Sequence, residues 1–290
     1  ICAERGYAVD IAGYDAAMDE ARKRSEFRGM EQAVESVYRD ALQKVASGAV
    51  AFTGYEHDLD QSRVVALIKS GALCDSVSAG DQVEVVTERT PFYGESGGQV
   101  GDQGVITLEG VRPQVSDTQR PVAGLVVHRC SVEAGTLSVG DEVELRVDVA
   151  RRDATRRNHS ATHLLHWALR KVVGAHAQQK GSLVGPERLR FDFTHGKPLS
   201  HEQVSEIEDL VNQRALANAP IRTEVLSMDE AKKRGAMMIF EEKYGDTVRM
   251  LSMLESTELC GGTHARATGD IGLFKIQAEQ GVAAGVRRVV

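Results

Sequence analysis

The sequence lacks several features that would at once assign it to a broad class of protein. No apolar run approaches the roughly 18–20 residues that cross a bilayer, which excludes a helical membrane span. Cysteine is scarce: the four cysteines, at positions 2, 74, 130 and 260, are too few and too scattered for a disulfide framework. We therefore expect reduced thiols in a cytoplasmic protein without a membrane partner.

Positive charge is not in excess either. The 35 basic residues are outnumbered by 42 acidic ones, and the net charge of −7 argues against a histone-like general nucleic-acid binder. This balance still permits a local basic face. Internal repeats and low-complexity segments are also missing. The chain has neither an initiator Met nor a signal region, and residues 286–290 are strand-like, so we expect a piece excised from a longer chain.

What is present is the composition of an ordinary globular protein. The apolar fraction is 42% and the charged fraction is 27%, which excludes intrinsic disorder, collagen and a coiled-coil fibre. At about 150 residues per domain, 290 residues predict two domains.

Three zones of the chain differ in their residue pattern. Residues 14–46 are rich in helix formers with charges of mixed sign, which predicts one or two solvated helices. Residues 50–149 hold short β-rich runs separated by glycine turns. In one of these runs Val143, Leu145 and Val147 share a face by alternation. Short strands at this spacing predict a small β-barrel.

Helical and strand patterns mix from residue 151 onward. Capping boxes at Ser200 and Ser227 predict helices that end near residues 218–220 and at Gly235. Strand-like runs follow at residues 248–251 and 272–276. The predicted fold class is therefore α+β, and its three parts follow the chain: a helical leader over residues 1–48, a β-barrel over 49–149 and an α+β core with an antiparallel sheet over 150–290.

The most informative segment is a helix predicted over residues 156–170. At 100° per residue, its apolar side chains fall on one arc, and His159, His163, His166 and Arg170 fall on the opposite arc. His159 and His163 are one turn apart, so their rings project side by side, which suits two ligands of one divalent metal. The alternative is a solvated helix face that happens to hold three histidines.

A second segment, residues 258–264, supplies the same kind of ligand. Cys260 and His264 lie four residues apart around two glycines, which allow the backbone to turn tightly. One cysteine with three histidines is a donor set that suits Zn²⁺. Four protein ligands are typical of a structural site and an open position of a catalytic one, and the spacing does not decide between them. The alternative for Cys260 is a small buried apolar residue in an ordinary glycine loop.

A third segment, residues 90–102, combines apolar rings with closely spaced polar residues and glycines. It fits a shaped loop that lets another backbone approach closely, or equally a barrel hairpin with its turn. It matches no dinucleotide fingerprint. Residues 174–182 fail as a phosphate loop because Gln179 stands where a glycine is required, so binding of ATP or a dinucleotide is unsupported.

Basic residues cluster locally despite the acidic total. If they converge in space, they form a phosphate-binding rim around the metal site; otherwise they are solvated faces. The residues concerned are Arg151, Arg152, Arg156, Arg157, Lys180, Arg188, Arg190, Arg287 and Arg288.

Together these segments resemble the alanyl-tRNA synthetase family, specifically its editing region, with bacterial-type members as the nearest pattern. The resemblance runs from about residue 4 to the last residue. The matching stretches are residues 90–104 (TPFYGESGGQVGDQG), 158–165 (NHSATHLL), 179–184 (QKGSLV), 189–193 (LRFDF), 258–264 (ELCGGTH), 268–274 (TGDIGLF) and 284–288 (AGVRR).

The resemblance implies a zinc-dependent deacylase. In that family the region hydrolyses the ester of tRNA(Ala) wrongly charged with serine or glycine. The family's Zn²⁺ ligands correspond to His159, His163, Cys260 and His264. Its reaction site corresponds to Thr162, Gln179, Cys260 and His163, with the Thr162 hydroxyl placed to recognise a serine side chain. The partner implied is the acceptor stem and 3′ end of tRNA(Ala), held by Arg157, Lys180 and Arg190, and we expect no DNA partner.

The chain departs from the family pattern in two respects, and two alternative functions stay open. Glu241 stands where the family has glycine, which affects the expected conformation of residues 240–244. The family's ATP-dependent aminoacylation domain would precede residue 1, so residues 1–290 are not expected to attach alanine to tRNA. The alternatives are a free-standing trans-editing deacylase and a non-enzymatic RNA-binding module whose zinc is structural.

Overall fold

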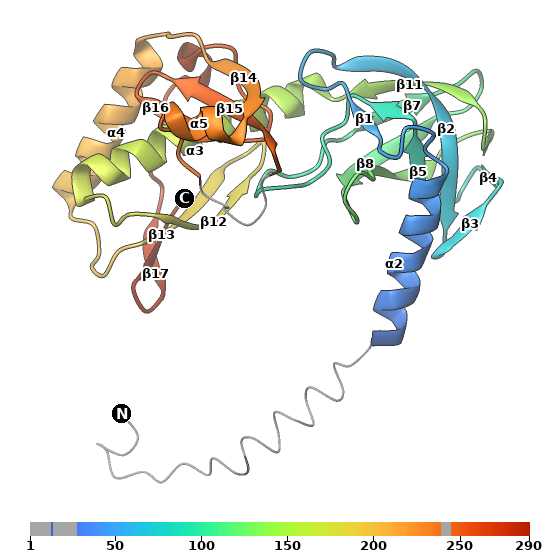
Figure 1. The fold of residues 1–290 in the computed structure, drawn as a ribbon, viewed down its shortest axis with the longest axis horizontal. Helices are drawn as coiled ribbons and strands as arrows, with labels where there is room; N and C mark the ends of the chain where they lie inside the picture. Colours follow the sequence, from blue (N-terminus) through green and yellow to red (C-terminus); the bar gives the residue numbers. More distant parts are fainter. Residues whose placement is uncertain (1–12, 14–27, 239–244) are drawn as a thin grey trace.

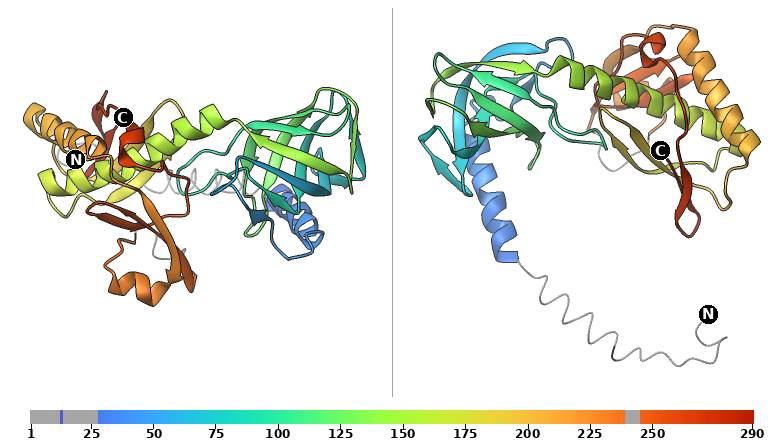
Figure 2. Two further views of the ribbon diagram at one scale, coloured as in Figure 1. Left: turned by 90° about the horizontal axis from the view of Figure 1, so that it is seen from above. Right: turned by 180° about the vertical axis from the view of Figure 1, so that it is seen from behind.

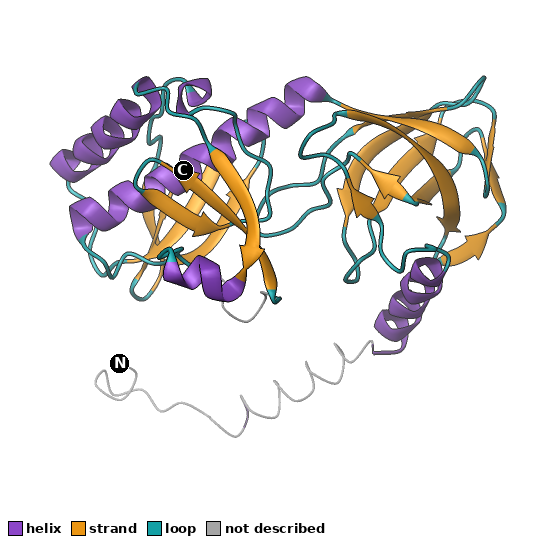
Figure 3. Cartoon of the chain, turned by 45° about the horizontal axis from the view of Figure 1, so that its top comes forward, coloured by secondary structure: helices purple, strands orange, loops and turns teal. Residues whose placement is uncertain are grey.

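The computed structural model describes residues 13, 28–238 and 245–290 (Figure 1). This part of the chain forms a β-barrel and an α+β core that lie side by side, and the helix α3 (Val149–Val173) runs from one into the other (Figures 2 and 3). The predicted α+β class is confirmed. None of the helices in the described ranges is both long and apolar enough to cross a membrane.

The barrel is a closed antiparallel sheet. Its strands and the short strands around it are β1 (Ala51–Phe52), β2 (Leu59–Lys69), β3 (Ala72–Cys74), β4 (Ser76–Ser78), β5 (Gln82–Thr87), β6 (Arg89–Thr90), β7 (Gly104–Thr107), β8 (Pro113–Gln119), β9 (Val127–Val132), β10 (Thr136–Ser138) and β11 (Glu142–Val147). Strands β2, β5, β9, β8, β7 and β11 pair in this order, and β11 pairs back with β2, which closes the ring. Val143, Leu145 and Val147 are buried in its interior, as their alternation predicted.

The described part of the predicted leader is the helix α2 (Arg28–Gln43). Val37 and Ala41 are buried against the outside of the barrel, in one cluster with Val86 and Val127. The helix therefore has a packed face, whereas the sequence predicted solvated helices. The remainder of that prediction falls on residues 1–12 and 14–27, which lie outside the described residues, as does the variant loop at residues 240–244.

The core packs helices against two small antiparallel sheets. Its elements after α3 are β12 (Gln179–Val184), β13 (Leu189–Thr194), α4 (His201–Leu216), β14 (Arg222–Ser227), α5 (Met228–Lys233), β15 (Thr247–Met253), β16 (Ser256–Leu259), the 3₁₀ helix η3 (Thr268–Ile271), β17 (Glu279–Ala283) and β18 (Val286–Val289). The sheet orders are β12-β13-β18-β17 and β14-β15-β16. Leu164 and Leu165 of α3 are buried in one cluster with Phe191 and Phe193 of β13, so this helix forms the centre of the core.

Both predicted helix starts are present. Ser200 and Gln203 form the full capping box of α4, in which each side chain accepts from the backbone N–H of the other residue. Ser227 caps α5 by accepting from the N–H of Glu230, but the Glu230 side chain pairs with Arg234 instead of returning to the cap. The two helices end close to the predicted positions.

The strand predicted at residues 272–276 is wrong. Among the described residues no strand pairs with this segment, and side chains of α4 satisfy its backbone instead. Asn212 accepts from the N–H of Phe274 and donates to its carbonyl, and Glu208 accepts from the N–H of Ile276. Helix side chains thus take the place of a neighbouring strand along this segment.

Candidate metal centre and the pocket beside it

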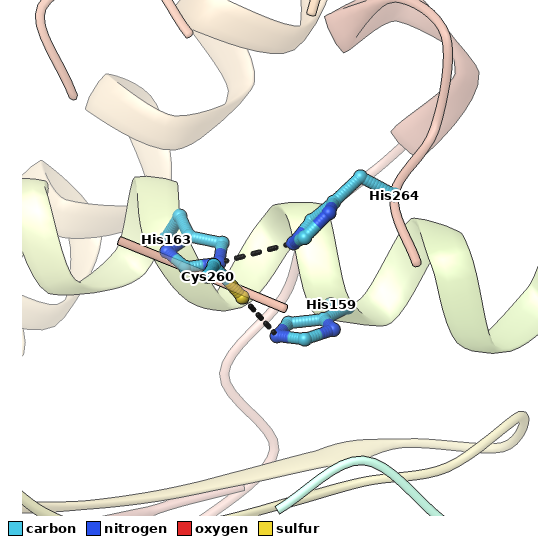
Figure 4. A group of neighbouring side chains, drawn as sticks. All are labelled: His159, His163, Cys260 and His264. Carbon is cyan, nitrogen blue, oxygen red and sulfur yellow. Dashed lines mark hydrogen bonds between the residues drawn. The ribbon is translucent and has the colours of Figure 1, made fainter. Parts of the chain in front are cut away.

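Two segments that are about 100 residues apart in sequence meet at one point of the core (Figure 4). His159 and His163 project from adjacent turns of α3, and Cys260 and His264 come from the loop that follows β16. The ligand atoms of these four side chains lie within 4.8 Å of one another. The structure therefore joins the histidine pair and the Cys/His pair into one group that can hold a metal ion.

Two of the distances within this group match those of a tetrahedral zinc site. Sγ of Cys260 lies 3.5 Å from Nε2 of His159, and Nε2 of His163 lies 3.2 Å from Nε2 of His264. Zinc bound at about 2.3 Å to sulfur and about 2.0–2.1 Å to nitrogen places such pairs about 3.6 and 3.3 Å apart. The residues present thus fit Zn²⁺ in donor chemistry, and two of their pairs fit it in spacing.

The histidine-bearing face of α3 is buried. The exposed fractions of His159, His163 and His166 are 6%, 5% and 2%. Because Leu164 and Leu165 on the opposite face are also buried, the middle of the helix is enclosed on all sides. The solvated-face alternative is therefore wrong, and burial places the rings in an environment that strengthens their electrostatic interactions.

Hydrogen bonds from outside the cluster orient two of the rings. Nδ1 of His159 lies 2.8 Å from Oε1 of Gln99, and Nδ1 of His163 lies 2.6 Å from Oε2 of Glu258. Amide and carboxylate oxygens accept, so each Nδ1 carries a proton, and each Nε2 faces the other residues of the cluster. Sequence reasoning missed both partners, although Gln99 and Glu258 fall within the stretches that resemble the synthetase family.

The charges of the cluster call for a cation. Burial raises the pKa of the Cys260 thiol, but the nearby His159, His264 and His163 outweigh it and hold that pKa well below its usual value. Burial would lower the pKa of His163, yet Glu258 and Cys260 raise it to about 10. Burial lowers the pKa of His264 to about 3. A thiolate at Cys260 and a buried carboxylate at Glu258 thus lie beside the imidazole rings, and a divalent metal would balance their negative charge.

The backbone of the Cys/His loop is held by residues of both the core and the barrel. Arg249 of β15 donates to the carbonyls of Cys260 and Gly262, both at 3.0 Å, and its guanidinium lies 4.0 Å from the ring centroid of Tyr55. Tyr55, in the loop between β1 and β2, donates to the carbonyl of Gly261 at 2.6 Å. Both barrel and core therefore shape the loop that carries two of the four ligands.

A pocket of about 440 Å³ adjoins the cluster at His264, between the barrel and the core. Tyr55 lines it from the barrel, and Arg157, Arg249 and Arg266 line it from the core. Arg156 also reaches this pocket, where it pairs with Asp58 and Asp153. A molecule in this pocket would touch His264 of the cluster and several guanidinium groups at once.

The predicted basic residues do not form a single rim. Arg157 lines the 440 Å³ pocket, whereas Arg190 lines a separate pocket of about 510 Å³ together with Arg151, Arg188 and Arg288. Arg152 belongs to neither, because it is completely buried in an ion pair with Asp102. Its assignment to a phosphate-binding rim is wrong.

The other predicted reaction-site residues, Thr162 and Gln179, lie on α3 and β12. Thr162 precedes His163, is 5% exposed and donates to the carbonyl of Asn158 at 2.8 Å. Gln179 begins β12 and donates to Oγ of Ser182 at 3.1 Å, and Lys180 beside it is exposed. The roles assigned to these residues remain predictions.

Comparison with known proteins identifies the family. Residues 1–151, just over half of the chain, match the sequence model of tRNA synthetases class II (A), and residues 248–290 match that of the threonyl and alanyl tRNA synthetase second additional domain. Over 100% of its length, the chain is 56% identical to the alanine--tRNA ligase of Sorangium cellulosum and 54% identical to that of Anaeromyxobacter sp.. It covers 33% and 32% of the lengths of these two relatives. The alanine--tRNA ligase of Mesorhizobium japonicum is 49% identical over 99% of this chain and 34% of its own length. The chain thus spans about a third of the length of these relatives. With this identity along its whole length, and with the resemblance of its motifs confirmed, the chain belongs to the alanyl-tRNA synthetase family.

Proposed function

We propose that the chain is the editing region of an alanyl-tRNA synthetase, which hydrolyses the ester that links serine or glycine to mischarged tRNA(Ala). The observation that carries this proposal is the three-histidine, one-cysteine cluster, in which His159 and His163 are buried, beside a pocket lined by several arginines and carboxylates. The match of residues 248–290 to the second additional domain of threonyl and alanyl synthetases supports it. Within this proposal residues 1–48 are a leader, 49–149 the barrel domain and 150–290 the deacylase core.

A separate hydrolytic site is needed because binding alone discriminates weakly between alanine and similar amino acids. A pocket that accepts alanine rejects the smaller glycine only weakly, and it rejects poorly a near-isostere that adds one hydroxyl. A second site that hydrolyses wrong products supplies the missing discrimination. Hydrolysis of the serine ester must then depend on a contact that the alanine ester lacks.

We propose that His159, His163, Cys260 and His264 hold Zn²⁺. When bound, zinc supplies a positive charge that polarises a carbonyl oxygen or a water molecule. The protein contributes the orientation of the ligands, through the hydrogen bonds that Nδ1 of His159 and Nδ1 of His163 donate.

We assign the discrimination between the serine and alanine esters to Thr162. Its hydroxyl donates to the Asn158 carbonyl, which leaves the lone pairs of Oγ1 to accept from another group. A serine side chain has a hydroxyl that can donate to Oγ1, and an alanine side chain has none. Gln179, at the start of β12, is the second pocket residue in this proposal.

We assign binding of the 3′ end of the RNA to the basic residues. Single-stranded RNA carries one negative charge per phosphate, and arginine binds phosphate through paired N–H groups. Arg157 in the pocket beside His264 would hold the terminal nucleotide, and Arg190 in the second pocket, with Lys180, would hold the strand behind it. An acidic protein can therefore still bind one RNA end through a few local cations.

The direct test is hydrolysis of Ser-tRNA(Ala) and Ala-tRNA(Ala) by this chain, measured together with its zinc content. We expect rapid loss of the serine ester and slow loss of the alanine ester. Cys260→Ala and His163→Ala should each abolish most of the hydrolysis, whereas His176→Ala, at an exposed histidine, should leave it unchanged. Thr162→Val should reduce the preference for the serine ester by at least about tenfold.

Two results would contradict the proposal. Hydrolysis by Cys260→Ala and His163→Ala at the unmutated rate would show that the cluster takes no part. Zinc and tRNA binding without hydrolysis of either ester would favour an RNA-binding module whose zinc is structural.

A further inference from the structure

The loop between β6 and β7, residues 91–103, is fixed to α3 at its base. Asp102 lies in this loop and pairs with Arg152 of α3, whose Nε lies 2.8 Å from Oδ1. The same guanidinium donates to the carbonyl of Pro91 at 2.6 Å, and Asp102 also accepts from the N–H of Tyr93. The two ends of the loop are thus held together around one arginine that is completely buried.

The far part of the loop leaves the barrel and joins the core. The N–H of Val100 donates to the carbonyl of Val184 at 3.0 Å, and the N–H of Val184 donates to the carbonyl of Gly98 at 2.7 Å. Gly98 has a φ of +90°, and a Cβ there would lie 2.3 Å from Oγ of Ser182. The close approach of the loop to β12 therefore depends on a glycine at this position.

Gln99, at the tip of this loop, contacts both segments of the metal centre. Its side chain is completely buried. Oε1 lies 2.8 Å from Nδ1 of His159 and 2.9 Å from the backbone nitrogen of Thr263, and Nε2 donates to Oγ1 of Thr263 at 2.8 Å. One amide thus bridges a metal ligand on α3 and the residue that precedes the ligand His264.

The orientation of this amide fixes the tautomer of His159. A backbone N–H can only donate, so the atom that faces Thr263 must be the oxygen of Gln99. Since that oxygen also faces Nδ1 of His159, Nδ1 must carry a proton, and Nε2 is left with the lone pair that a metal requires.

The two contacts of the loop with α3 lie on one face of the helix. Arg152 and His159 are seven residues apart, which is about two helical turns. The loop therefore runs along α3 from the Arg152 ion pair to the ring of His159. The barrel thus contributes a loop that packs against this face of the helix.

We propose that Gln99 is a positioning residue of the metal centre, and that the barrel thereby completes a site whose four ligands all belong to the core. This inference rests on the metal-binding part of the proposed function and not on which ester is hydrolysed. Partners of this kind change metal affinity by about 10–100-fold when they are removed.

The test compares three variants of the full chain by zinc affinity and by the visible spectrum of the Co²⁺-substituted protein. Gln99→Leu keeps a side chain of similar size and removes its hydrogen bonds to His159 and Thr263, so zinc affinity should fall about 10–100-fold and the Co²⁺ bands should shift. Gln99→Glu keeps an acceptor for His159 and Thr263 and should restore the affinity to within about threefold. Gln103→Leu is the matched control, because Gln103 lies in the same loop but donates to the Ser116 carbonyl at the surface, and it should change neither readout.

Unchanged zinc affinity and an unchanged Co²⁺ spectrum in a folded Gln99→Leu would overturn the inference. If that variant does not fold, Gln99→Asn serves instead: its shorter amide cannot span His159 and Thr263, so wild-type affinity in that variant would overturn it equally. Failure of the proposed function gives a different result. In that case the variants bind zinc in the expected order, but the unmutated chain leaves Ser-tRNA(Ala) intact.

Discussion

Glu258 accepts a hydrogen bond from Nδ1 of His163 at 2.6 Å, and this contact links a fully buried carboxylate to a ligand of the candidate metal centre. Ser256 donates to its other oxygen at 3.0 Å, so the carboxylate is held from two sides. His166, one turn beyond His163, has its Nδ1 3.8 Å from the same carboxylate. The negative charge of Glu258 therefore lies beside the rings of His163 and His166.

Replacing Glu258 should weaken metal binding. Glu258→Gln keeps an acceptor but removes the charge, so we expect about a tenfold loss of zinc affinity; Glu258→Ala leaves the Nδ1 proton of His163 unpaired and should cost more. Competition with a chromogenic chelator measures both. Glu255→Gln removes an exposed partner of Arg214 and is the matched control. Equal zinc affinity in Glu258→Gln and the unmutated chain would contradict the assignment.

Breaking the Arg152–Asp102 ion pair should destabilise the protein strongly. Arg152→Met leaves the Asp102 carboxylate buried without a cation, and removal of one member of a buried pair costs about 3–5 kcal/mol. Urea denaturation followed by circular dichroism measures the loss. Arg63→Ala, which breaks an exposed pair with Glu142, should cost no more than about 1 kcal/mol. Similar losses in the two variants would show that Asp102 finds another partner.

The barrel should lose stability as the pH falls from about 6.5 to 4. His128 is completely buried: its Nδ1 lies 2.8 Å from the Val85 carbonyl and its Nε2 lies 2.8 Å from Oγ1 of Thr90. Burial lowers the pKa of His128 to about 4. In that window the unfolded chain binds a proton that the folded barrel does not, so the free energy of unfolding decreases on acidification, by about 3 kcal/mol in total.

Urea denaturation at a series of pH values, compared between the unmutated chain and His128→Gln, isolates this contribution. The difference in unfolding free energy between the two should change by about 3 kcal/mol across the window. His57→Gln, at an exposed histidine, should run parallel to the unmutated chain. A pH-independent difference for His128→Gln would refute the prediction.

The two glycines of the Cys/His loop should respond differently to alanine. A Cβ on Gly262 would lie 2.1 Å from Cε1 of His159, so Gly262→Ala must displace the ring or the loop. A Cβ on Gly261 would meet nothing closer than Oη of Tyr55 at 4.0 Å. We expect at least a tenfold loss of zinc affinity in Gly262→Ala and almost none in Gly261→Ala, measured by chelator competition. Equal affinities would mean that the His159 ring is not confined by this loop.

The sequence predicts those parts of the site that depend on local geometry. The four-residue spacing of His159 and His163 places both rings on one helix face. The glycines beside Cys260 predict a tight turn, but neither has a positive φ, and Gly262 instead leaves room for the His159 ring. The partners of these ligands depend on tertiary packing. Gln99 precedes His159 by 60 residues and lies in the loop between β6 and β7, so no periodicity connects them.

The wrong predictions for Arg152 and for residues 272–276 also arise because tertiary packing decides the outcome. Arg152 carries the charge of a surface residue, but Asp102, 50 residues earlier in the chain, balances that charge in the interior. The run at residues 272–276 has the pattern of a strand, but Asn212 and Glu208 of α4 satisfy its backbone. In both cases a distant polar side chain outweighs the local pattern.

Helix α3 is a single uninterrupted element of 25 residues, or about 37 Å at 1.5 Å per residue. Its first turns are bound by the barrel through Arg152, and its middle turns carry His159 and His163. A hinge motion between barrel and core would have to break a buried ion pair or withdraw Gln99 from the His159 ring. Two contacts at different points along α3 therefore hold the β6–β7 loop of the barrel against the core, one at Arg152 and one at His159.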